Sequence, residues 1–339
     1  MEGCGEWRPW HGHFTFALGF ASLPPNWPLV HASLSLWIGF NVLVLALLGA
    51  DMMLFRRADR PAGTGRLVLT TLVWIAVAIA FGLWIGHRAG SGKSLEFFTG
   101  YLIEYALSLD NILLFVLIFS SFAIAPEQQR RVLFWGVMGA LVMRGLMILA
   151  GVALIERFAW IFYVFGAYII YAGASLVLPR THRPVEEGRV VRLARRWLPL
   201  STETNSTRFI VREAGRRRFT LLFLVLIVIE LTDLVFALDS IPAIFGVTTD
   251  PFIVYTSNAC AIMGLRSLYF LLARAVRSLV YLQPGLAAVL VFIGAKMLLK
   301  DVAPISTGTS LAVVGGILAV AVIASLLKGP KGKEAHAHT

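Results

Sequence analysis

The sequence has few charged residues: Asp, Glu, Lys and Arg make up 14% of its 339 residues, whereas 58% are hydrophobic. Soluble proteins carry about a quarter charged residues, so a soluble globular fold is excluded. Apolar stretches of about twenty residues recur along the chain, and this is the length at which a helix crosses a bilayer. The sequence therefore predicts an all-α polytopic membrane protein whose immediate partner is the lipid bilayer.

Cysteine and histidine are also scarce. Of the two cysteines, Cys4 and Cys260, the second lies inside an apolar stretch, so no disulfide framework is indicated. None of the seven histidines lies deep in a core span. A Zn²⁺ or Cu⁺ site would require imidazole or thiolate ligands. Any metal chemistry inside the spans must therefore use oxygen ligands, which suit Mg²⁺, Ca²⁺ and Mn²⁺.

Catalytic and nucleic-acid-binding signals are missing too. The chain has no HExxH motif, no phosphate-binding loop and no nucleophile–base pair at a usable spacing, so we expect neither an enzyme nor a prosthetic group. The net charge of +11 does not indicate nucleic acid, because the basic residues lie in short segments between apolar stretches. The acidic Glu2 and Glu6 at the N-terminus argue against a cleaved signal peptide.

Nine apolar spans can be counted along the chain. They cover residues 33–55, 67–87, 99–121, 132–154, 158–178, 219–241, 252–273, 283–299 and 308–327. The basic segments 56–66, 122–131 and 179–218, the segment after 273 and the tail 328–339 alternate with segments poor in Lys and Arg. Because basic loops stay in the cytoplasm, this alternation predicts a bacterial inner-membrane protein with its N-terminus outside and its C-terminus in the cytoplasm.

One pattern in the chain occurs twice. Glu104-Tyr-Ala-Leu-Ser-Leu-Asp110-Asn111 returns as Asp233-Leu-Val-Phe-Ala-Leu-Asp239-Ser240. Each copy is followed by a span with an arginine, Arg144 and then Arg266, and by a span with a Gly-Ala pair that begins at Gly166 and then at Gly294. Each half therefore has three spans. Since three is odd, the second half must enter the membrane the other way up, as an inverted repeat of three plus three helices.

The repeat divides the chain into segments. We expect an extracytoplasmic segment at 1–32, two peripheral helices at 33–87, the first repeat at 99–178, a basic cytoplasmic linker at 179–218, the second repeat at 219–299, a final helix at 308–327 and a cytoplasmic tail at 328–339.

Five acids lie deep in the two halves, where carboxylates are costly and point to function. They are Glu104, Asp110, Glu230, Asp233 and Asp239, and Asn111, Ser240 and Asn258 add neutral oxygens. Three cations, Arg144, Arg266 and Lys296, leave two negative charges uncompensated, which a divalent cation or two protons would neutralise. We take these acids and neutral oxygens as the candidate metal ligands. Arg144 and Arg266 are assigned a supporting or gating role, and Lys296, near a span end, is left out. The alternative is a set of purely structural ion pairs.

Helical geometry constrains the two acids of each copy. Glu104 and Asp110 lie about 120° apart on an ideal helix, as do Asp233 and Asp239. Either the helices unwind there, or the two acids of a copy face different neighbours. Pro242 follows the second copy closely and favours unwinding, so we expect the strongest irregularity at 239–242.

These motifs resemble the TerC family. The two acidic motifs carry the resemblance together with Phe134-Trp-Gly-Val137, Asp250-Pro-Phe252 and Gly264-Leu-Arg-Ser-Leu-Tyr-Phe270. It runs from about residue 33 to 327, and the N-terminal pair of helices looks like the Alx branch. The resemblance implies manganese export, with the duplicated acids as the ion site.

We therefore expect a divalent cation exporter, with Mn²⁺ as the transported ion, that works by alternating access. Protons are a candidate counter-ion, because burial favours the protonated form of a carboxylic acid. The alternative is a non-transporting membrane partner that assists insertion or metal loading of other proteins. The residues alone do not decide among Mn²⁺, Ca²⁺ and Mg²⁺. The sequence also leaves open the coupling ion, the oligomeric state and the role of the Arg-rich linker.

Overall fold

The computed structural model describes residues 33–56, 63–177, 199–201, 208–213, 215–275 and 281–328. For a few residues in these ranges, Asp110 and Arg266 among them, only the backbone is described. The predicted segment 1–32, most of the linker 179–218 and nearly all of the tail 328–339 lie outside the described residues.

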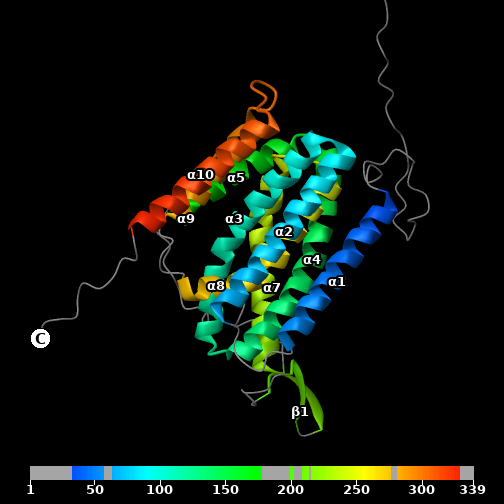
Figure 1. Cartoon of the computed structure of the whole chain (residues 1–339), viewed down its shortest axis with the longest axis vertical. Coiled ribbons are helices and arrows are strands. Elements are labelled where there is room, and N and C mark those ends of the chain that lie inside the picture. Colours follow the sequence, from blue (N-terminus) through cyan, green and yellow to red (C-terminus); the bar gives the residue numbers. More distant parts are fainter. Residues whose placement is uncertain are drawn as a thin grey trace, which may run out of the picture.

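The described chain is almost entirely helical (Figure 1). Its helices are α1 (Leu34–Arg56), α2 (Thr64–Ala89), α3 (Ser91–Ser121), α4 (Pro126–Arg157), α5 (Ile161–Val177), α7 (Leu221–Phe245), α8 (Pro251–Ala275), α9 (Leu282–Leu298) and α10 (Thr307–Lys328). These nine helices of the described chain match the nine predicted spans and confirm the all-α polytopic class. By length and composition, α1, α2, α4, α7 and α10 could each cross a membrane, and shorter apolar helices lie at 161–176, 251–265 and 282–298.

A small β-hairpin was not predicted. Strand β1 (Ile210–Glu213) pairs antiparallel with β2 (Arg216–Phe219) inside the segment expected to be a basic linker. The turn between them uses Gly215 with a positive φ of 77°, a conformation that glycine adopts without a steric penalty. We call the end of the bundle next to β1–β2 the hairpin end, and the other end the far end (Figure 1).

Local sequence explains where the helices begin. Pro126 and Pro251 each occupy the first turn of a helix, where the missing backbone N–H is not needed. Asp250 caps α8 by accepting hydrogen bonds from the backbone N–H groups of Phe252 (3.1 Å) and Ile253 (3.3 Å). The hydroxyl of Thr220 accepts from the backbone N–H of Phe223 at the start of α7.

Helices α3–α5 and α7–α9 are packed as an inverted repeat. Helix α3 packs on α8 and, by exchange of the two halves, α4 packs on α7, while α5 packs on its counterpart α9. Thr248, which follows α7, hydrogen-bonds Glu96 near the start of α3, and Tyr269 near the end of α8 hydrogen-bonds Gln129 near the start of α4. Equivalent helices therefore run in opposite directions.

The two repeat-equivalent glycines meet at the α5–α9 interface. A Cβ added at Gly294 would lie 2.6 Å from the carbonyl oxygen of Gly166, and one added at Gly166 would lie 3.2 Å from the carbonyl oxygen of Gly294. Because each copy faces the other, the pseudo-two-fold axis passes between them. The absence of side chains lets the two backbones approach closely.

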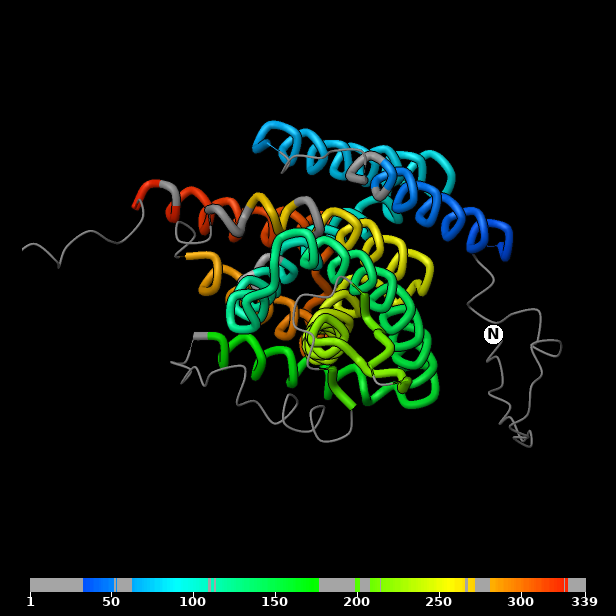
Figure 2. The backbone as a smooth tube through the Cα atoms, turned by 90° about the horizontal axis from the view of Figure 1, so that it is seen from below, coloured from blue at the N-terminus to red at the C-terminus, as the bar shows by residue number. Residues whose placement is uncertain are grey.

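Helix α7 lies in the middle of the bundle. Figure 2 shows it nearly end-on, with the other helices around it and α1 and α2 along one outer side. The predicted unwinding at 239–242 is wrong, because α7 is continuous from Leu221 to Phe245 with Pro242 inside it. Pro242 lies in the last turn, so its missing N–H removes only one hydrogen bond close to the helix end. Helix α3 is continuous through Asp110 as well.

We predict that Gly294→Ala destabilises the protein by about 1–3 kcal/mol, because the added methyl group meets the backbone of α5 in a well-packed interface. Thermal unfolding in detergent measures the effect. Gly39→Ala is the matched control, since a Cβ at Gly39 of α1 would have nothing within 4 Å. Equal unfolding temperatures for the two variants would contradict the close approach of α5 and α9.

Candidate cation site

A buried arginine occupies the centre of the charged constellation. The side chain of Arg144 on α4 is 1% exposed and donates hydrogen bonds from Nε and Nη2 to the two carboxylate oxygens of Asp233, at 3.1 and 2.9 Å. Its Nη1 donates to Glu104 Oε1 and to Ser240 Oγ, the latter at 3.2 Å. The pairing with Asp233 is bidentate, the arrangement in which guanidinium binds a carboxylate most specifically.

This cluster joins the two halves of the repeat. Glu104 comes from α3 and Arg144 from α4, whereas Asp233 and Ser240 come from α7. Glu104 and Asp233 are the first acids of their respective copies of the motif, so the arginine bridges repeat-equivalent carboxylates. Buried charges require such pairing, because an isolated ion inside the bundle would be strongly destabilising.

Some polar atoms near this centre have no partner. Glu104 Oε2, Ser108 Oγ and Asn258 Nδ2 are buried and lack a hydrogen-bond partner. Ser108 lies one turn after Glu104 on the same face of α3, and Asn258 lies on α8, which packs against α3. An unsatisfied buried polar atom costs about 1–3 kcal/mol. A bound cation or water that contacts Glu104 Oε2 would remove part of this cost.

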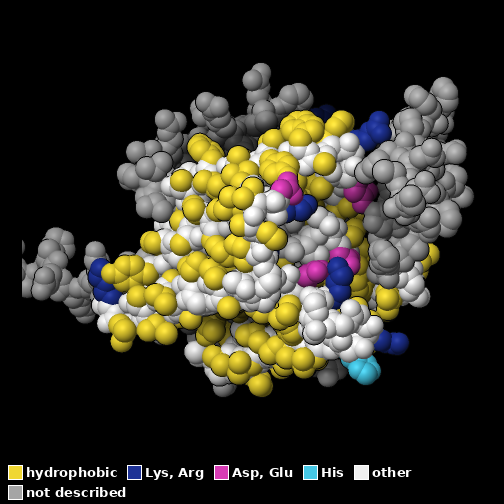
Figure 3. Space-filling model, turned by 90° about the horizontal axis from the view of Figure 1, so that it is seen from above, with side chains coloured by type: hydrophobic (Ala, Val, Ile, Leu, Met, Phe, Trp, Pro, Cys, Tyr) yellow, Lys and Arg dark blue, Asp and Glu magenta, His cyan; other side chains and the backbone are white. Residues whose placement is uncertain are grey.

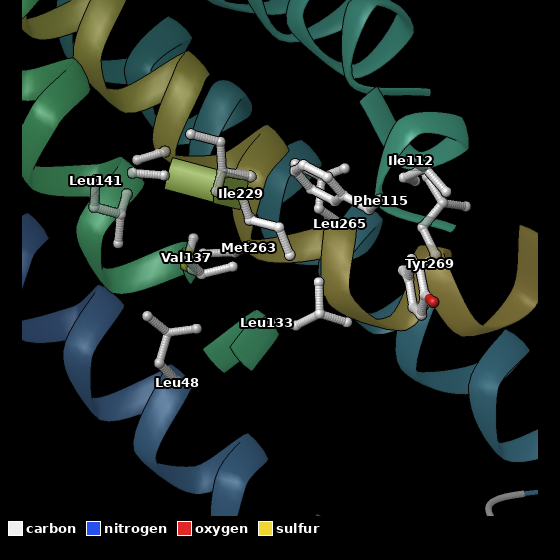
Figure 4. Close-up of a cluster of buried hydrophobic side chains, with 14 of the residues drawn as sticks. Leu48, Ile112, Phe115, Leu133, Val137, Leu141, Ile229, Met263, Leu265 and Tyr269 are labelled. Carbon is white, nitrogen blue, oxygen red and sulfur yellow. The ribbon is translucent and has the colours of Figure 1, made fainter. Parts of the chain in front are cut away.

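Glu230 lies one turn from Asp233 towards the hairpin end, and it faces α4. A Cβ added at Gly139 would lie 2.2 Å from Glu230 Oε1, so only glycine leaves room for this carboxylate. Glu230 and Asp233 line a cavity of about 30 Å³, whose other walls are apolar and include Phe115, Leu133 and Val137. Figure 4 shows these apolar side chains converging with Ile229 and Leu265. The cavity is large enough for one water molecule or a small ion.

The second acid of the α7 motif faces a different neighbour from the first. Asp239 Oδ1 accepts a hydrogen bond of 2.7 Å from the hydroxyl of Tyr168 on α5. The sequence left two alternatives, an unwound helix or two acids that face different neighbours. For Asp233 and Asp239 the structure shows the second. Asn111 is buried on α3. For Asp110 on α3 and Arg266 on α8, the side chains lie outside the description, so their predicted roles are not tested.

Among the residues whose side chains the structure describes, no group of three or more His, Cys, Asp or Glu is arranged to hold a metal ion. In particular, Glu104 and Asp233 are brought together by the guanidinium of Arg144 and not by a third carboxylate. Five of the eight predicted ligands are thus distributed over the Arg144 cluster, the neighbouring cavity at Glu230 and the contact between Asp239 and Tyr168. Asn111 and Asn258 are buried on α3 and α8, and the side chain of Asp110 lies outside the description.

A charged vestibule opens at the far end of the bundle. Its volume is about 660 Å³, and its lining includes Lys93, Glu96, Glu156, Thr248 and Asp250. Figure 3 shows acidic and basic side chains around a hollow at this end. Glu96 accepts hydrogen bonds from Lys93 (2.9 Å) and Thr248 (2.6 Å), and Lys93 also pairs with Asp250 at 3.3 Å. These contacts tie the start of α3 to the loop between α7 and α8.

Phe245 closes the floor of the vestibule. Its side chain is 2% exposed, stacks on Phe165 with ring centroids 6.3 Å apart, and packs so closely on Gly151 that a Cβ there would lie 2.6 Å from the ring. Phe245 ends α7, the helix that carries Asp233 and Ser240 further inside. An apolar barrier therefore separates the open vestibule from the buried charges.

Sequence reasoning found the acids but missed Tyr168, the partner of Asp239, and the polar residues of the vestibule. Tyr168 was read as part of an apolar span, and the vestibule residues Lys93 and Glu96 were assigned to a loop. The spacing of Lys93 and Glu96 is that of neighbours on a helix, which could have suggested the pair. Their contacts with Thr248 and Asp250 cross from one half of the repeat to the other and have no local signal.

Comparison with known proteins identifies relatives along most of the chain. Residues 89–333 match the model of the integral membrane protein TerC family. The chain is 46% identical to "Uncharacterized membrane protein STKORF319" of Myxococcus xanthus over 294 residues, which are 86% of this chain and 92% of that protein. It is 42% identical to "Putative membrane-bound redox modulator Alx" of Escherichia coli K12 over 298 residues, covering 85% of this chain and 93% of that protein.

A plant relative is similar in the same region. The "Thylakoid membrane protein TERC, chloroplastic" of Arabidopsis thaliana is 42% identical over 259 residues, which are 76% of this chain and 67% of that protein. No solved structure matches the chain.

We predict that Asp233→Asn lowers the free energy of unfolding by about 1.5–3 kcal/mol, because it removes the bidentate acceptor of a buried guanidinium. Glu230→Gln, three residues earlier on α7, should lower it by less, because the Glu230 carboxylate accepts none of the hydrogen bonds that Arg144 donates. Chemical unfolding in mixed micelles compares the two variants. Equal losses would contradict the assignment of Asp233 as the partner of Arg144.

Proposed function

The chain belongs to the TerC family of integral membrane proteins, and on this premise we propose that it exports a divalent metal cation, with Mn²⁺ as the cargo, by alternating access. One observation carries the proposal: two repeat-equivalent carboxylates, Glu104 and Asp233, are buried at the interface of an inverted repeat, and one oxygen of Glu104 has no partner. Secondary transporters place their ion sites at such an interface.

The proposed cargo follows from the available ligands. Glu104, Glu230 and Asp233 offer carboxylate oxygens, and Ser240 offers a neutral oxygen. Mn²⁺, Mg²⁺ and Ca²⁺ accept such ligands. The resemblance to the TerC family ranks Mn²⁺ first among the three. The proposed partners are the lipid bilayer, the cation and protons, and we propose neither a catalytic reaction nor a prosthetic group.

We propose that the hairpin end faces the cytoplasm of a bacterial inner membrane. Arg130 and Arg131 at the start of α4 lie at this end together with the arginines of β1–β2, and Arg131 stacks on Phe209 beside the hairpin. At the far end, Lys93 is balanced by Glu96 and Asp250. Excess basic residues on one side of the bundle support a cytoplasmic location for that side.

A path for the cation follows from this orientation. The cation would reach the cavity beside Glu230 from the cytoplasm, pass to Asp233 and Glu104, and leave through the far-end vestibule after Phe245 moves. In the present structure the path is closed at Phe245, so release requires the two halves of the repeat to move against each other. The contacts of Glu96 with Lys93 and Thr248 hold the vestibule end of α3 in place and would have to adjust in that motion.

Export against an inside-negative membrane potential requires a driving ion. Moving a charge outward costs about 2.3 kcal/mol for each 100 mV, and a divalent cation carries two charges. Inward movement of protons would supply this energy if the same carboxylates bind either protons or metal. Proton antiport is therefore the coupling that we propose.

The Alx relatives are named as redox modulators, and such a role would commonly use a pair of cysteine thiols. The part of the chain that the structure describes contains no such pair. Cys260 is the free cysteine there, and its side chain is buried. We therefore base the proposed function on the carboxylates and not on thiol chemistry.

The direct test uses purified protein in liposomes, with Mn²⁺, Mg²⁺ and Ca²⁺ supplied one at a time and a pH gradient imposed in either direction. We expect Mn²⁺ flux that depends on the protein and increases when protons move in the opposite direction. Absence of flux for all three ions, with stable partners that co-purify from the membrane, would overturn the proposal. It would favour a non-transporting partner that assists insertion or metal loading of other proteins.

A steric change beside Glu230 tests the proposed entry. Gly139→Ala should lower Mn²⁺ flux by roughly tenfold, which corresponds to about 1.4 kcal/mol of lost cation binding. The added methyl group would occupy the place of the flexible Glu230 carboxylate and displace it without disturbing the backbone. Gly39→Ala on α1 is the control, because a Cβ there would have nothing within 4 Å and Gly39 does not line this cavity. Unchanged flux in Gly139→Ala would remove Glu230 from the path.

A further inference from the structure

We propose that Arg144 is a tethered counter-cation: its guanidinium occupies the carboxylate site when no cargo is bound, and the divalent cation must displace it in order to bind. The inference rests on the proposed function and adds to it a named competitor inside the protein. It assigns Arg144 a role in setting cation affinity and release, beyond orienting the acids.

The oxygens of the proposed site are already in use. Both oxygens of Asp233 and one oxygen of Glu104 accept hydrogen bonds from Arg144, and so does the hydroxyl of Ser240. These contacts engage all three nitrogens of the guanidinium. A cation that binds through Asp233 must therefore take at least one oxygen from the guanidinium, because the two positive charges cannot share the same site without repulsion.

The balance of charge around Arg144 favours a divalent cargo. With all groups ionised, Glu104, Asp233 and Arg144 sum to a single negative charge, and Glu230 adds another beside the same cavity. A divalent cation compensates these two charges, whereas a monovalent cation leaves one uncompensated in a membrane interior, where this is costly. A cation of higher charge is therefore the better competitor for Asp233, and the tethered arginine favours divalent over monovalent cargo.

Arg144 also connects the two halves of the repeat mechanically. Arg144 on α4 is bonded to α3 through Glu104 and to α7 through Asp233 and Ser240, so it holds elements of both halves of the repeat together. Displacement of the guanidinium by cargo would loosen this connection and allow the halves to move. When the cargo leaves, the guanidinium returns and pairs again with Asp233 and Glu104. The empty protein can then reset without carrying two unpaired carboxylates through its closed state.

The unpartnered Glu104 Oε2 is consistent with this exchange. The guanidinium uses one oxygen of Glu104 and leaves the other without a partner, although both are buried. A cation that arrives from the cavity at Glu230 could first bind an oxygen that the arginine does not occupy. Binding would then proceed stepwise and would not require complete separation of Arg144 from Glu104 and Asp233 beforehand.

Arg144→Gln tests the inference, because glutamine keeps a hydrogen-bonding side chain and removes the competing charge. We expect the variant in detergent to bind Mn²⁺ roughly tenfold more tightly than the wild-type protein. In liposomes, we expect net Mn²⁺ efflux to fall by roughly tenfold, while exchange of Mn²⁺ for Mn²⁺ continues, since only the return of the empty protein requires the arginine. Arg157→Gln at the exposed end of α4 is the control and should match the wild type in all three measurements.

A second variant covers the case in which Arg144→Gln does not fold. Arg144→Lys keeps the positive charge but cannot form the bidentate pair. It should bind Mn²⁺ with an affinity between those of the wild type and a variant without charge, and it should retain part of the net efflux. An ordinary structural arginine would instead lower binding, exchange and net efflux together with the unfolding temperature.

The outcomes separate the two proposals. If the wild-type protein neither binds nor moves any of the three divalent cations, the proposed function fails and this inference with it. If the wild type binds Mn²⁺ but Arg144→Gln or, where that variant does not fold, Arg144→Lys binds it equally or more weakly, the proposed function stands and the tethered counter-cation is overturned.

Discussion

The structure depends on one interaction, the pairing of the Arg144 guanidinium with Asp233 and Glu104 inside the bundle. An arginine at this depth is unfavourable without carboxylate partners, and the carboxylates are equally unfavourable without the arginine. Because the partners come from α3, α4 and α7, their mutual requirement fixes how the two halves of the repeat meet. The same contacts leave one oxygen of Glu104, Oε2, without a partner at the centre of the bundle.

The pairing of Arg144 with Asp233 and Glu104 lies at the interface between the two halves of the inverted repeat. The backbones of α5 and α9 touch at Gly166 and Gly294, which are equivalent positions, while α3 and α7 bring the equivalent acids Glu104 and Asp233 to one guanidinium. The backbones of the two halves are related by a pseudo-two-fold axis, but their charged side chains are not. Arg144 lies between the two acids, and the vestibule with Lys93 and Glu96 opens at the far end of the bundle. On the proposed function, this asymmetry would distinguish the exit from the entrance.

Much of the fold could be predicted from the sequence, because the relevant signals are local. Apolar stretches of membrane-spanning length predicted the helices, and an odd number of spans in each repeat predicted the inversion. The expected unwinding at Pro242 was wrong, since a proline in the final turn of a helix removes little hydrogen bonding. The hairpin β1–β2 was missed inside a charged segment whose composition suggested only a linker.

The candidate site was predictable in its members but not in its geometry. Buried acids at duplicated positions are visible in the sequence, and their cost in a membrane led to the hypothesis that they are functional. That Arg144 contacts Glu104 and Asp233 together, while Asp239 pairs with Tyr168, depends on the packing of helices from different parts of the chain. The angle between the two acids on an ideal helix left two possibilities, an unwound helix or acids that face different neighbours. Only the three-dimensional arrangement decided between them.

The central claim is that a divalent cation and the Arg144 guanidinium compete for the same carboxylates. An anomalous-scattering map from crystals of the protein grown with Mn²⁺, collected at the manganese absorption edge, tests it most directly. The account predicts a peak within coordinating distance of Asp233 and Glu104, with Arg144 withdrawn from at least one oxygen of Asp233. Occupied manganese sites only elsewhere in the protein, with the pairing of Arg144 and Asp233 intact, would contradict it.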